Sequence, residues 1–235
     1  MSEHGTNSSL WLASASPRRH QLLSLLNLPF EVCTPNVSEQ PLLSEPPAEM
    51  VKRLSRLKAQ ACAQHLDEGS VVAADTIVVL LGRVLGKPQN EAEAGAMLRA
   101  LRGRRHLVLT GHTTLNAATG KTITDVCESK VTIRAMSDKE IEAYIASGDP
   151  LDKAAAYAVQ NEEFQPASEV IGCPANVMGL PVCHIARDLY RHGVALPPSR
   201  PRQCRIGYGY LCAIVDEVMP GARVEGLAPP PPHVK

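Results

Sequence analysis

The sequence has few aromatic residues, no excess of either charge and no long hydrophobic run. Aromatic side chains make up 3% of the 235 residues, too few for the stacking surfaces that bind single-stranded nucleic acid. The 24 Lys and Arg residues balance 24 Asp and Glu residues, which argues against a basic surface that binds long nucleic acid. No apolar stretch approaches the roughly 20 residues of a membrane span, and the polar N-terminus does not resemble a signal peptide. We therefore expect a cytoplasmic protein that binds neither long nucleic acid nor membrane.

Paired cysteine motifs are also missing. None of the seven cysteines forms a C-x-x-C pair, so the sequence indicates neither a zinc knuckle nor a redox motif. We interpret most of these cysteines as small buried hydrophobic residues in a reducing compartment.

The apolar content, 44% of the residues, is enough for one sizeable core. Residue patterns predict strands over residues 10–13, 30–34, 71–81, 106–115 and 121–136. They predict helices between Ser16 and Pro29 and over residues 46–66, 91–101, 138–147 and 181–192. This order predicts an α/β domain with a mixed sheet flanked by helices. Because residues 197–235 hold eight of the nineteen prolines, we divide the chain into a domain (1–196) and a proline-rich tail (197–235) of unknown role.

The first predicted strand leads directly into a helix through residues 14–19 (SASPRR). A helix N-terminus offers unpaired N–H groups and the positive end of the helix dipole, which together favour an anion. Two hydroxyl and two guanidinium groups at the same turn would suit a phosphate chain. These side chains are Ser14, Ser16, Arg18 and Arg19. The alternative is that Ser16 only caps the helix and the arginines are solvated.

The strand predicted over residues 71–81 contains a carboxylate among apolar residues. Burial of Asp75 is costly unless it is paired, bound to a metal or placed beside a cleft. It is therefore a candidate for catalysis or metal binding, and the alternative is a structural aspartate. Thr76 should point to the opposite face. Three lysines in unusual settings become candidates if the fold brings them together: Lys58, Lys87 and Lys153.

Six short motifs resemble, in order and approximate spacing, those of the Maf family. They are residues 14–19 (SASPRR), 74–76 (ADT), 86–88 (GKP), 106–111 (HLVLTG), 150–154 (PLDKA) and 177–181 (VMGLP). The resemblance implies a mixed α/β fold shared with inosine-triphosphate pyrophosphatases, and a homodimer. It also implies an enzyme that hydrolyses a nucleoside triphosphate to the monophosphate and pyrophosphate with a divalent metal, Mg²⁺ or Mn²⁺.

The resemblance assigns a role to each candidate residue. Asp75 matches the family's proton acceptor, and Glu39 falls where the family has an acidic residue that helps to hold the metal. The substrate-specificity positions are Arg18, Thr76 and Gln160, and the cations on the phosphate side are Arg19, Lys58, Lys87 and Lys153. These roles agree with the chemistry, because water must be activated while negative charge builds on the leaving pyrophosphate.

Residues 155–160 (AAYAVQ) resemble the subgroup of the family that acts on dTTP and UTP, which has glutamine at the last position. The subgroup acting on 7-methyl-GTP has glutamate there. A neutral amide can both donate to and accept from a pyrimidine edge, so we favour dTTP and UTP. Two positions depart from the family: Asn161 stands where glycine usually follows the glutamine, and Ala155 also replaces a glycine.

Three alternatives remain open. The first is a 7-methyl-GTP pyrophosphatase of the same family. The second is a nucleotide-binding regulator of septum formation without catalysis, against which the intact Asp75 argues, because a pure binder does not need a water-activating carboxylate. The third makes the tail a docking segment for a partner.

Overall fold

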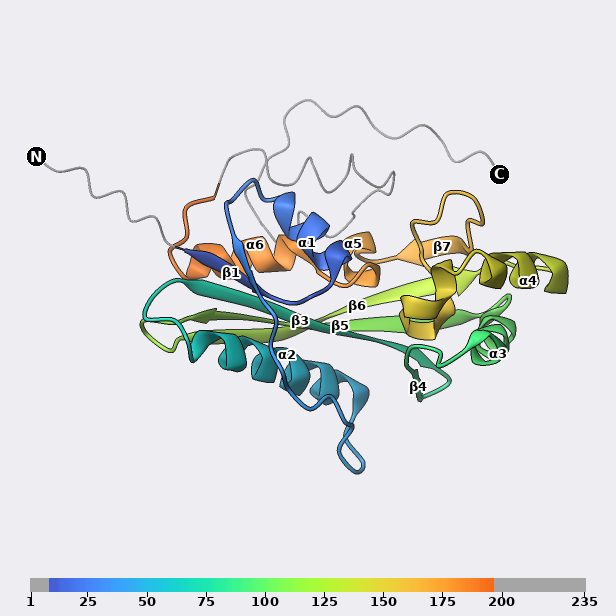
Figure 1. Ribbon diagram of the computed structural model, residues 1–235, viewed down its shortest axis with the longest axis horizontal. Helices are drawn as coiled ribbons and strands as arrows, with labels where there is room; N and C mark the ends of the chain where they lie inside the picture. The colour runs from blue at the N-terminus through green and yellow to red at the C-terminus, as the bar shows by residue number, and fades with distance from the viewer. Residues whose placement is uncertain (1–8, 197–235) are drawn as a thin grey trace, which may run out of the picture.

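The computed structural model describes residues 9–196, and its elements are drawn in Figure 1. The strands are β1 (Leu10–Ala13), β2 (Glu31–Cys33), β3 (Ser70–Leu80), β4 (Arg83–Leu85), β5 (Arg105–Asn116), β6 (Thr122–Ile133) and β7 (Ala167–Ile171). The helices are α1 (Pro17–Ser24), α2 (Pro47–Ala63), α3 (Glu91–Leu101), α4 (Asp138–Ala146), α5 (Pro174–Val177) and α6 (Val182–Arg191). Two 3₁₀ turns, η1 (Asp149–Asp152) and η2 (Ala154–Ala156), follow α4.

These strands form one mixed sheet in the order β2-β1-β3-β5-β6-β7, with β4 paired to β3. β1 runs parallel to β2 and β3, and the other pairs are antiparallel. Helices α1, α5 and α6 cover one face of the sheet and α2 covers the other (Figure 1). The predicted fold class, a mixed sheet flanked by helices, is confirmed.

Alternation along β3 sends its side chains to two different layers. The side chains that pack with residues of α2 are Val71, Ala73, Ile77 and Val79. Those in the larger core beneath α1, α5 and α6 are Val72, Ala74, Val78 and Leu80. Asp75 follows the first set and Thr76 the second, so the two residues face opposite layers, as the sequence predicts.

One side of β3 is open in the middle of the strand. β1 pairs with β3 up to Val72, and β4 pairs with it from Val78 onward. Within the described chain no strand lies on that side of residues 73–77, although β5 continues along the other side. The chain leaves β1 at Ala13 and enters α1, so the turn at residues 14–19 faces this open edge of β3 (residues 73–77).

Helix α2 packs closely on β5 at Gly111. A Cβ atom there would overlap the backbone of Val51 and lie 2.6 Å from the backbone nitrogen of Lys52. Gly111 is the register partner of Asp75. The absence of a side chain at Gly111 thus lets α2 approach the sheet next to Asp75.

The long periodic elements and the short strands β1 and β2 lie where the sequence predicts them, whereas other short elements are missed. α3 has its predicted bounds, and α4 begins with the predicted capping box of Ser137 and Glu140. The strand predicted over residues 121–136 ends earlier, at Ile133, and continues as a loop. β4, β7, α5 and the two 3₁₀ turns, three to five residues each, are too short to show periodicity.

The first helix is also shorter than predicted. α1 ends at Ser24, not just before Pro29, because the chain turns at Asn27, whose φ of 51° lies in the left-handed region. The predicted tail, residues 197–235, lies outside the described residues.

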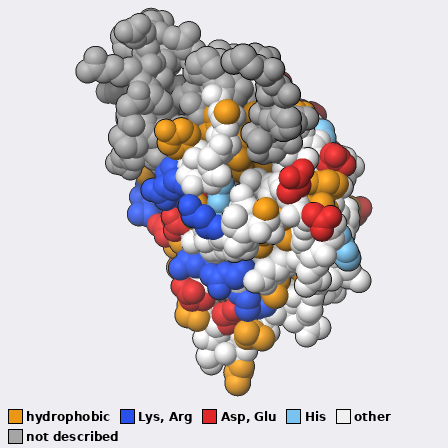
Figure 2. Space-filling model, turned by 90° about the vertical axis from the view of Figure 1, so that its left-hand side faces the viewer, with side chains coloured by type: hydrophobic (Ala, Val, Ile, Leu, Met, Phe, Trp, Pro, Cys, Tyr) orange, Lys and Arg blue, Asp and Glu red, His pale blue; other side chains and the backbone are white. Residues whose placement is uncertain are grey.

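Charges of both signs stand side by side on the surface. On the face in Figure 2, Lys and Arg side chains form small groups with Asp and Glu next to them, as the balanced composition leads one to expect. Among residues 9–196 we find no helix both long enough and apolar enough to cross a membrane.

Candidate functional site

A cavity of about 430 Å³ lies at the open edge of β3. This volume is within the range of small-molecule sites. The cavity brings together all eleven candidates from the sequence: Ser14, Ser16, Arg18, Arg19, Glu39, Lys58, Asp75, Thr76, Lys87, Lys153 and Gln160. Both faces of β3 contribute, because no neighbouring strand closes the edge between them.

On the α2 side of β3, one ammonium group joins two carboxylates. Lys58 Nζ lies 2.6 Å from Asp75 Oδ1 and 2.7 Å from Glu39 Oε1. Lys58 and Asp75 expose 9% and 10% of their side chains, whereas Glu39 exposes 61%. Burial alone would raise the pKa of Glu39, but Lys58 and the nearby charges of Arg19 and Lys87 outweigh it and lower this pKa. The buried Asp75 is therefore paired, as its position in an apolar strand requires.

On the opposite side of β3, the guanidinium of Arg19 is held at fixed points. Its Nε donates to the carbonyl oxygen of Gly179 at 2.9 Å, and its Nη2 donates to Thr76 Oγ1 at 3.2 Å. Burial lowers the pKa of Arg19, and the charges of Asp75 and Glu39 oppose that change. Arg19 is thus not the solvated arginine of the alternative interpretation.

Both serines of the turn bind backbone groups. Ser16 caps α1 by accepting from the backbone nitrogen of Arg19 at 3.5 Å. Ser14 Oγ accepts from the backbone nitrogen of Ser16 at 3.2 Å. The helix begins at the cavity wall, so the positive end of its dipole faces the cavity.

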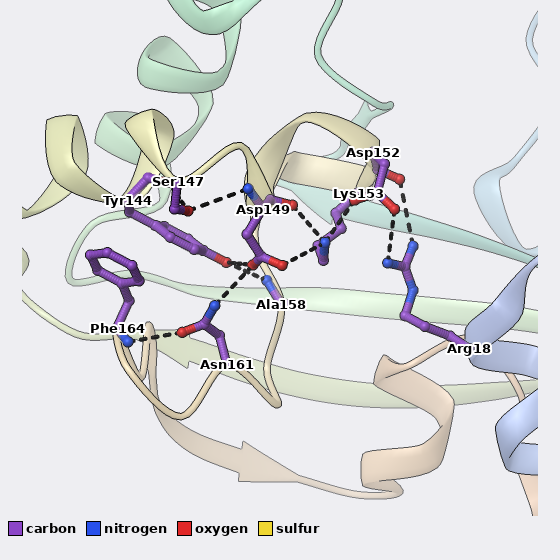
Figure 3. Close-up of polar contacts among 9 residues, drawn as sticks. All are labelled: Arg18, Tyr144, Ser147, Asp149, Asp152, Lys153, Ala158, Asn161 and Phe164. Atoms are coloured by element: carbon purple, nitrogen blue, oxygen red, sulfur yellow. Dashed lines mark hydrogen bonds and ion pairs between the residues drawn. The ribbon is translucent and has the colours of Figure 1, made fainter.

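Two further cations, Lys153 and Arg18, meet at the 3₁₀ turns beside the cavity (Figure 3). Lys153 Nζ lies 2.6 Å from Asp152 Oδ1 and 2.9 Å from Asp149 Oδ1. Arg18 Nη1 lies 3.1 Å from Asp152 Oδ2. Asp152 thus joins Arg18, on α1, to Lys153. Lys87 is exposed at the cavity wall, in the turn after β4.

The sequence did not predict the residues that contact Asp149, the ion-pair partner of Lys153. Tyr144 is fully buried, and its hydroxyl donates to Asp149 Oδ2 at 2.8 Å. Asn161 Nδ2 donates to the same oxygen at 3.1 Å. The hydroxyl of a tyrosine on the apolar face of a helix needs a hydrogen-bond partner. This requirement could have indicated that Tyr144 has a polar contact.

The donor set of the site fits a hard divalent cation. Asp75 and Glu39 contact one ammonium, so both carboxylates can reach a single cation. The described residues contain no group of three or more His, Cys, Asp or Glu side chains that could hold a metal alone. Mg²⁺ is commonly held by one or two carboxylates together with substrate phosphates, and these residues fit that pattern.

Comparison with known proteins places the chain in a family. The family model described as "Maf-like protein" matches residues 9–192. The chain belongs to the Maf-like family. The dTTP/UTP pyrophosphatase of Geobacter sulfurreducens is 42% identical over 182 residues, which are 77% of this chain and 95% of that protein. The dTTP/UTP pyrophosphatase of Anaeromyxobacter dehalogenans is 44% identical over 194 residues, which are 82% and 98% of the two chains.

One solved structure that matches this Maf-like chain is the Ham1 protein of Staphylococcus aureus. The match has a TM-score of 0.41 and 16% sequence identity, and covers 68% of this chain and 91% of that chain.

Proposed function

We propose that this protein hydrolyses dTTP and UTP to the monophosphate and pyrophosphate. The observation that carries the proposal is a single cavity in which the buried Asp75 stands among Arg19, Lys58, Lys87 and Lys153. Hydrolysis of a phosphoanhydride needs a base for water and fixed positive charge around the phosphates. The Maf-like relatives named dTTP/UTP pyrophosphatase support the same reaction.

Asp75 is the proposed proton acceptor. Lys58 binds its Oδ1, so the other oxygen, Oδ2, would take the proton from the attacking water. Arg19, fixed by Gly179 and Thr76, would orient the phosphate chain without reorganising as the reaction proceeds.

A divalent metal, Mg²⁺ or Mn²⁺, is part of the proposal. Asp75 and Glu39 are the residues that would hold it. When bound, such an ion would lower the pKa of a water molecule and neutralise charge on the phosphates.

Gln160 is proposed to select the base. It lines the cavity beside Ala158 and Val159, and its amide can both donate to and accept from a pyrimidine edge. Arg18 and Thr76 line the same cavity and are proposed to contribute to this specificity.

We further propose a homodimer in the cytoplasm. The family resemblance supports the dimer, which light scattering would test. Within residues 9–196, Cys33, Cys62 and Cys127 are not in disulfides, which fits a reducing compartment.

The decisive experiment is a screen for pyrophosphate release with Mg²⁺ and with Mn²⁺. The substrates are dTTP, UTP, the other common triphosphates and 7-methyl-GTP. We expect stoichiometric pyrophosphate and monophosphate from dTTP and UTP, with loss of activity in a chelator. Orthophosphate released stepwise from the γ position would disprove cleavage between the α and β phosphates. Preference for 7-methyl-GTP would disprove the substrate assignment alone.

A further inference from the structure

One carboxylate, that of Asp149, connects three parts of the chain behind the cavity (Figure 3). Its Oδ1 lies 2.9 Å from Lys153 Nζ. Its Oδ2 accepts from Tyr144 Oη at 2.8 Å and from Asn161 Nδ2 at 3.1 Å. Asp149 does not itself line the cavity, whereas Lys153 does. Its contacts therefore act on the site only through the residues that it holds.

Two of these contacts fix the loop that carries Gln160. The backbone nitrogen of Ala158 donates to Tyr144 Oη at 2.9 Å, so this hydroxyl links Ala158 to Asp149. Asn161, on the other side of Gln160, binds Asp149 directly. Gln160 is thus held from both sides, and both attachments lead to the same carboxylate.

The supporting groups are themselves well fixed. Tyr144 is fully buried in α4 and its ring lies 4.8 Å from the ring of Phe164. Asn161 Oδ1 also accepts from the backbone nitrogen of Phe164 at 2.8 Å. Burial would raise the pKa of Asp149, but hydrogen bonds from Lys153 and Tyr144 outweigh it and lower this pKa. Asp149 is therefore a carboxylate anion at neutral pH, and its partners would lose a charged acceptor if it were replaced.

We propose that Asp149 is a positioning residue that couples Lys153, on the phosphate side of the cavity, to Gln160, on the base side. The coupling rests on the proposed function, because it assumes that a triphosphate spans the two. Asn161 is the link on the loop side. Asp149 then sets the distance between the ammonium group of Lys153 and the amide of Gln160. Only a nucleotide whose base and phosphates fit this distance places its phosphates correctly.

The test separates phosphate binding from base selection. Inorganic tripolyphosphate, which has no base, reports on the phosphate side through its Kd. The ratio of kcat/KM for dTTP to that for dCTP reports on the base side, because these substrates differ at the pyrimidine edge. Asp149→Asn keeps the side-chain size and removes the charge, and Asn161→Ala removes only the loop link. Asp138→Asn, on an exposed residue of α4 that pairs with Arg99 and Arg102, is the matched control.

We expect Asp149→Asn to weaken tripolyphosphate binding about tenfold. The same variant should lower kcat/KM for dTTP by up to about 100-fold and reduce the preference for dTTP over dCTP. Asn161→Ala should reduce that preference and leave tripolyphosphate binding unchanged. Asp138→Asn should change neither quantity, and Asp149→Glu should restore part of the tripolyphosphate affinity.

Two results would overturn the coupling. One is an Asp149→Asn or Asn161→Ala variant that keeps the wild-type preference for dTTP. The other is an Asp138→Asn variant with the same defects as Asp149→Asn, which would indicate a general loss of stability. If Asp149→Asn does not fold, Asn161→Ala and Asp149→Glu decide the question. If the wild-type protein releases no pyrophosphate, the proposed function fails, and the ratio of Kd values for dTTP and dCTP in the same variants still judges the coupling.

Discussion

At the scale of single residues, ion pairs fix the positions of the charged side chains in the cavity. Lys58 lies between Asp75 and Glu39, so none of the three is an isolated charge. The pairing also places the two carboxylates where one positively charged group contacts both. Removing one member should therefore change the chemistry of the site before it changes the fold.

Replacing Asp75 with asparagine should abolish hydrolysis and spare nucleotide binding. The variant keeps the size of the side chain but loses the proposed proton acceptor, and loss of a positioned base typically costs about 10²–10⁴ in rate. Binding should be equal or tighter, because an anion near the phosphates is removed. Turnover and nucleotide affinity are measured on the same preparation, with the exposed Asp67→Asn as control. Near-normal turnover would remove Asp75 from the mechanism.

Ala155 is strained, and its replacement by glycine should stabilise the protein. Its φ of 57° is in the left-handed region, where a Cβ atom costs about 1–2 kcal/mol. Part of the gain is lost to the greater freedom of glycine in the unfolded chain and to the loss of a buried methyl group. We therefore expect an increase of less than about 1 kcal/mol in the free energy of unfolding. Ala154→Gly, at a position without positive φ, should destabilise instead. Urea denaturation of both variants checks the difference in sign.

At the scale of elements, the close packing of α2 on the sheet should be sensitive to one methyl group. In Gly111→Ala the new Cβ would overlap the backbone of Val51, and backbone cannot move aside as a flexible side chain can. We expect a loss of about 3 kcal/mol in stability. Because α2 carries Lys58, folded variant protein should also turn over more slowly.

Gly86→Ala is the control for this prediction. An added Cβ there has no heavy atom within 4 Å, and its φ is not positive. Thermal unfolding should therefore separate the two alanine variants by several degrees. Equal melting temperatures would show that α2 can shift away from β5 without cost.

The sequence predicts elements best where apolar residues recur over many positions. The pattern of β3 gave both its extent and the opposite orientations of Asp75 and Thr76. The short β7 and α5 carry no such pattern, and their positions depend on contacts with distant segments. The cavity itself depends on where β1 ends and β4 begins beside β3. Local patterns carry no information about that gap, so the grouping of the candidates rests on the family resemblance and on the fold.

The contacts that support the loop carrying Gln160 could not be predicted from the sequence either. Asp149 and Asn161 are ordinary polar residues in a region without periodicity. The contacts of Tyr144 and Asn161 with Asp149 appear only when the end of α4 and the loop meet in three dimensions. The departure at Asn161 was visible in the sequence, but its consequence for the loop was not.

At the scale of the whole molecule, a buried histidine should make stability depend on pH. His106 is 3% exposed, its Nε2 lies 2.7 Å from Tyr157 Oη, and burial lowers its pKa from 6.5 to about 4. Between these values the unfolded chain binds the proton and the folded chain does not. Stability therefore falls as the pH falls from 6.5 to about 4, by about 3 kcal/mol from this residue.

Replacing His106 with glutamine isolates this contribution. The amide cannot be protonated in this range, so the free energy of unfolding should change by about 3 kcal/mol less between pH 6.5 and 4. His65→Gln, at an exposed position, should leave the wild-type slope unchanged. Identical pH profiles for wild type and His106→Gln would show that this histidine is protonated as readily in the folded protein as in the unfolded chain.

The two faces of β3 at its open edge can be changed separately by substitution. Asp75 and Thr76 are adjacent in the chain, yet the backbone of β3 separates the groups that each contacts. Substitutions in these two layers share few partners, and changes without shared partners tend to be additive. Libraries that vary Thr76 can therefore be recombined with an unchanged Arg19 and an unchanged Asp75 layer. Under the specificity role proposed for Thr76, recombination of this kind would offer a route to new nucleotide preferences at constant hydrolytic capacity.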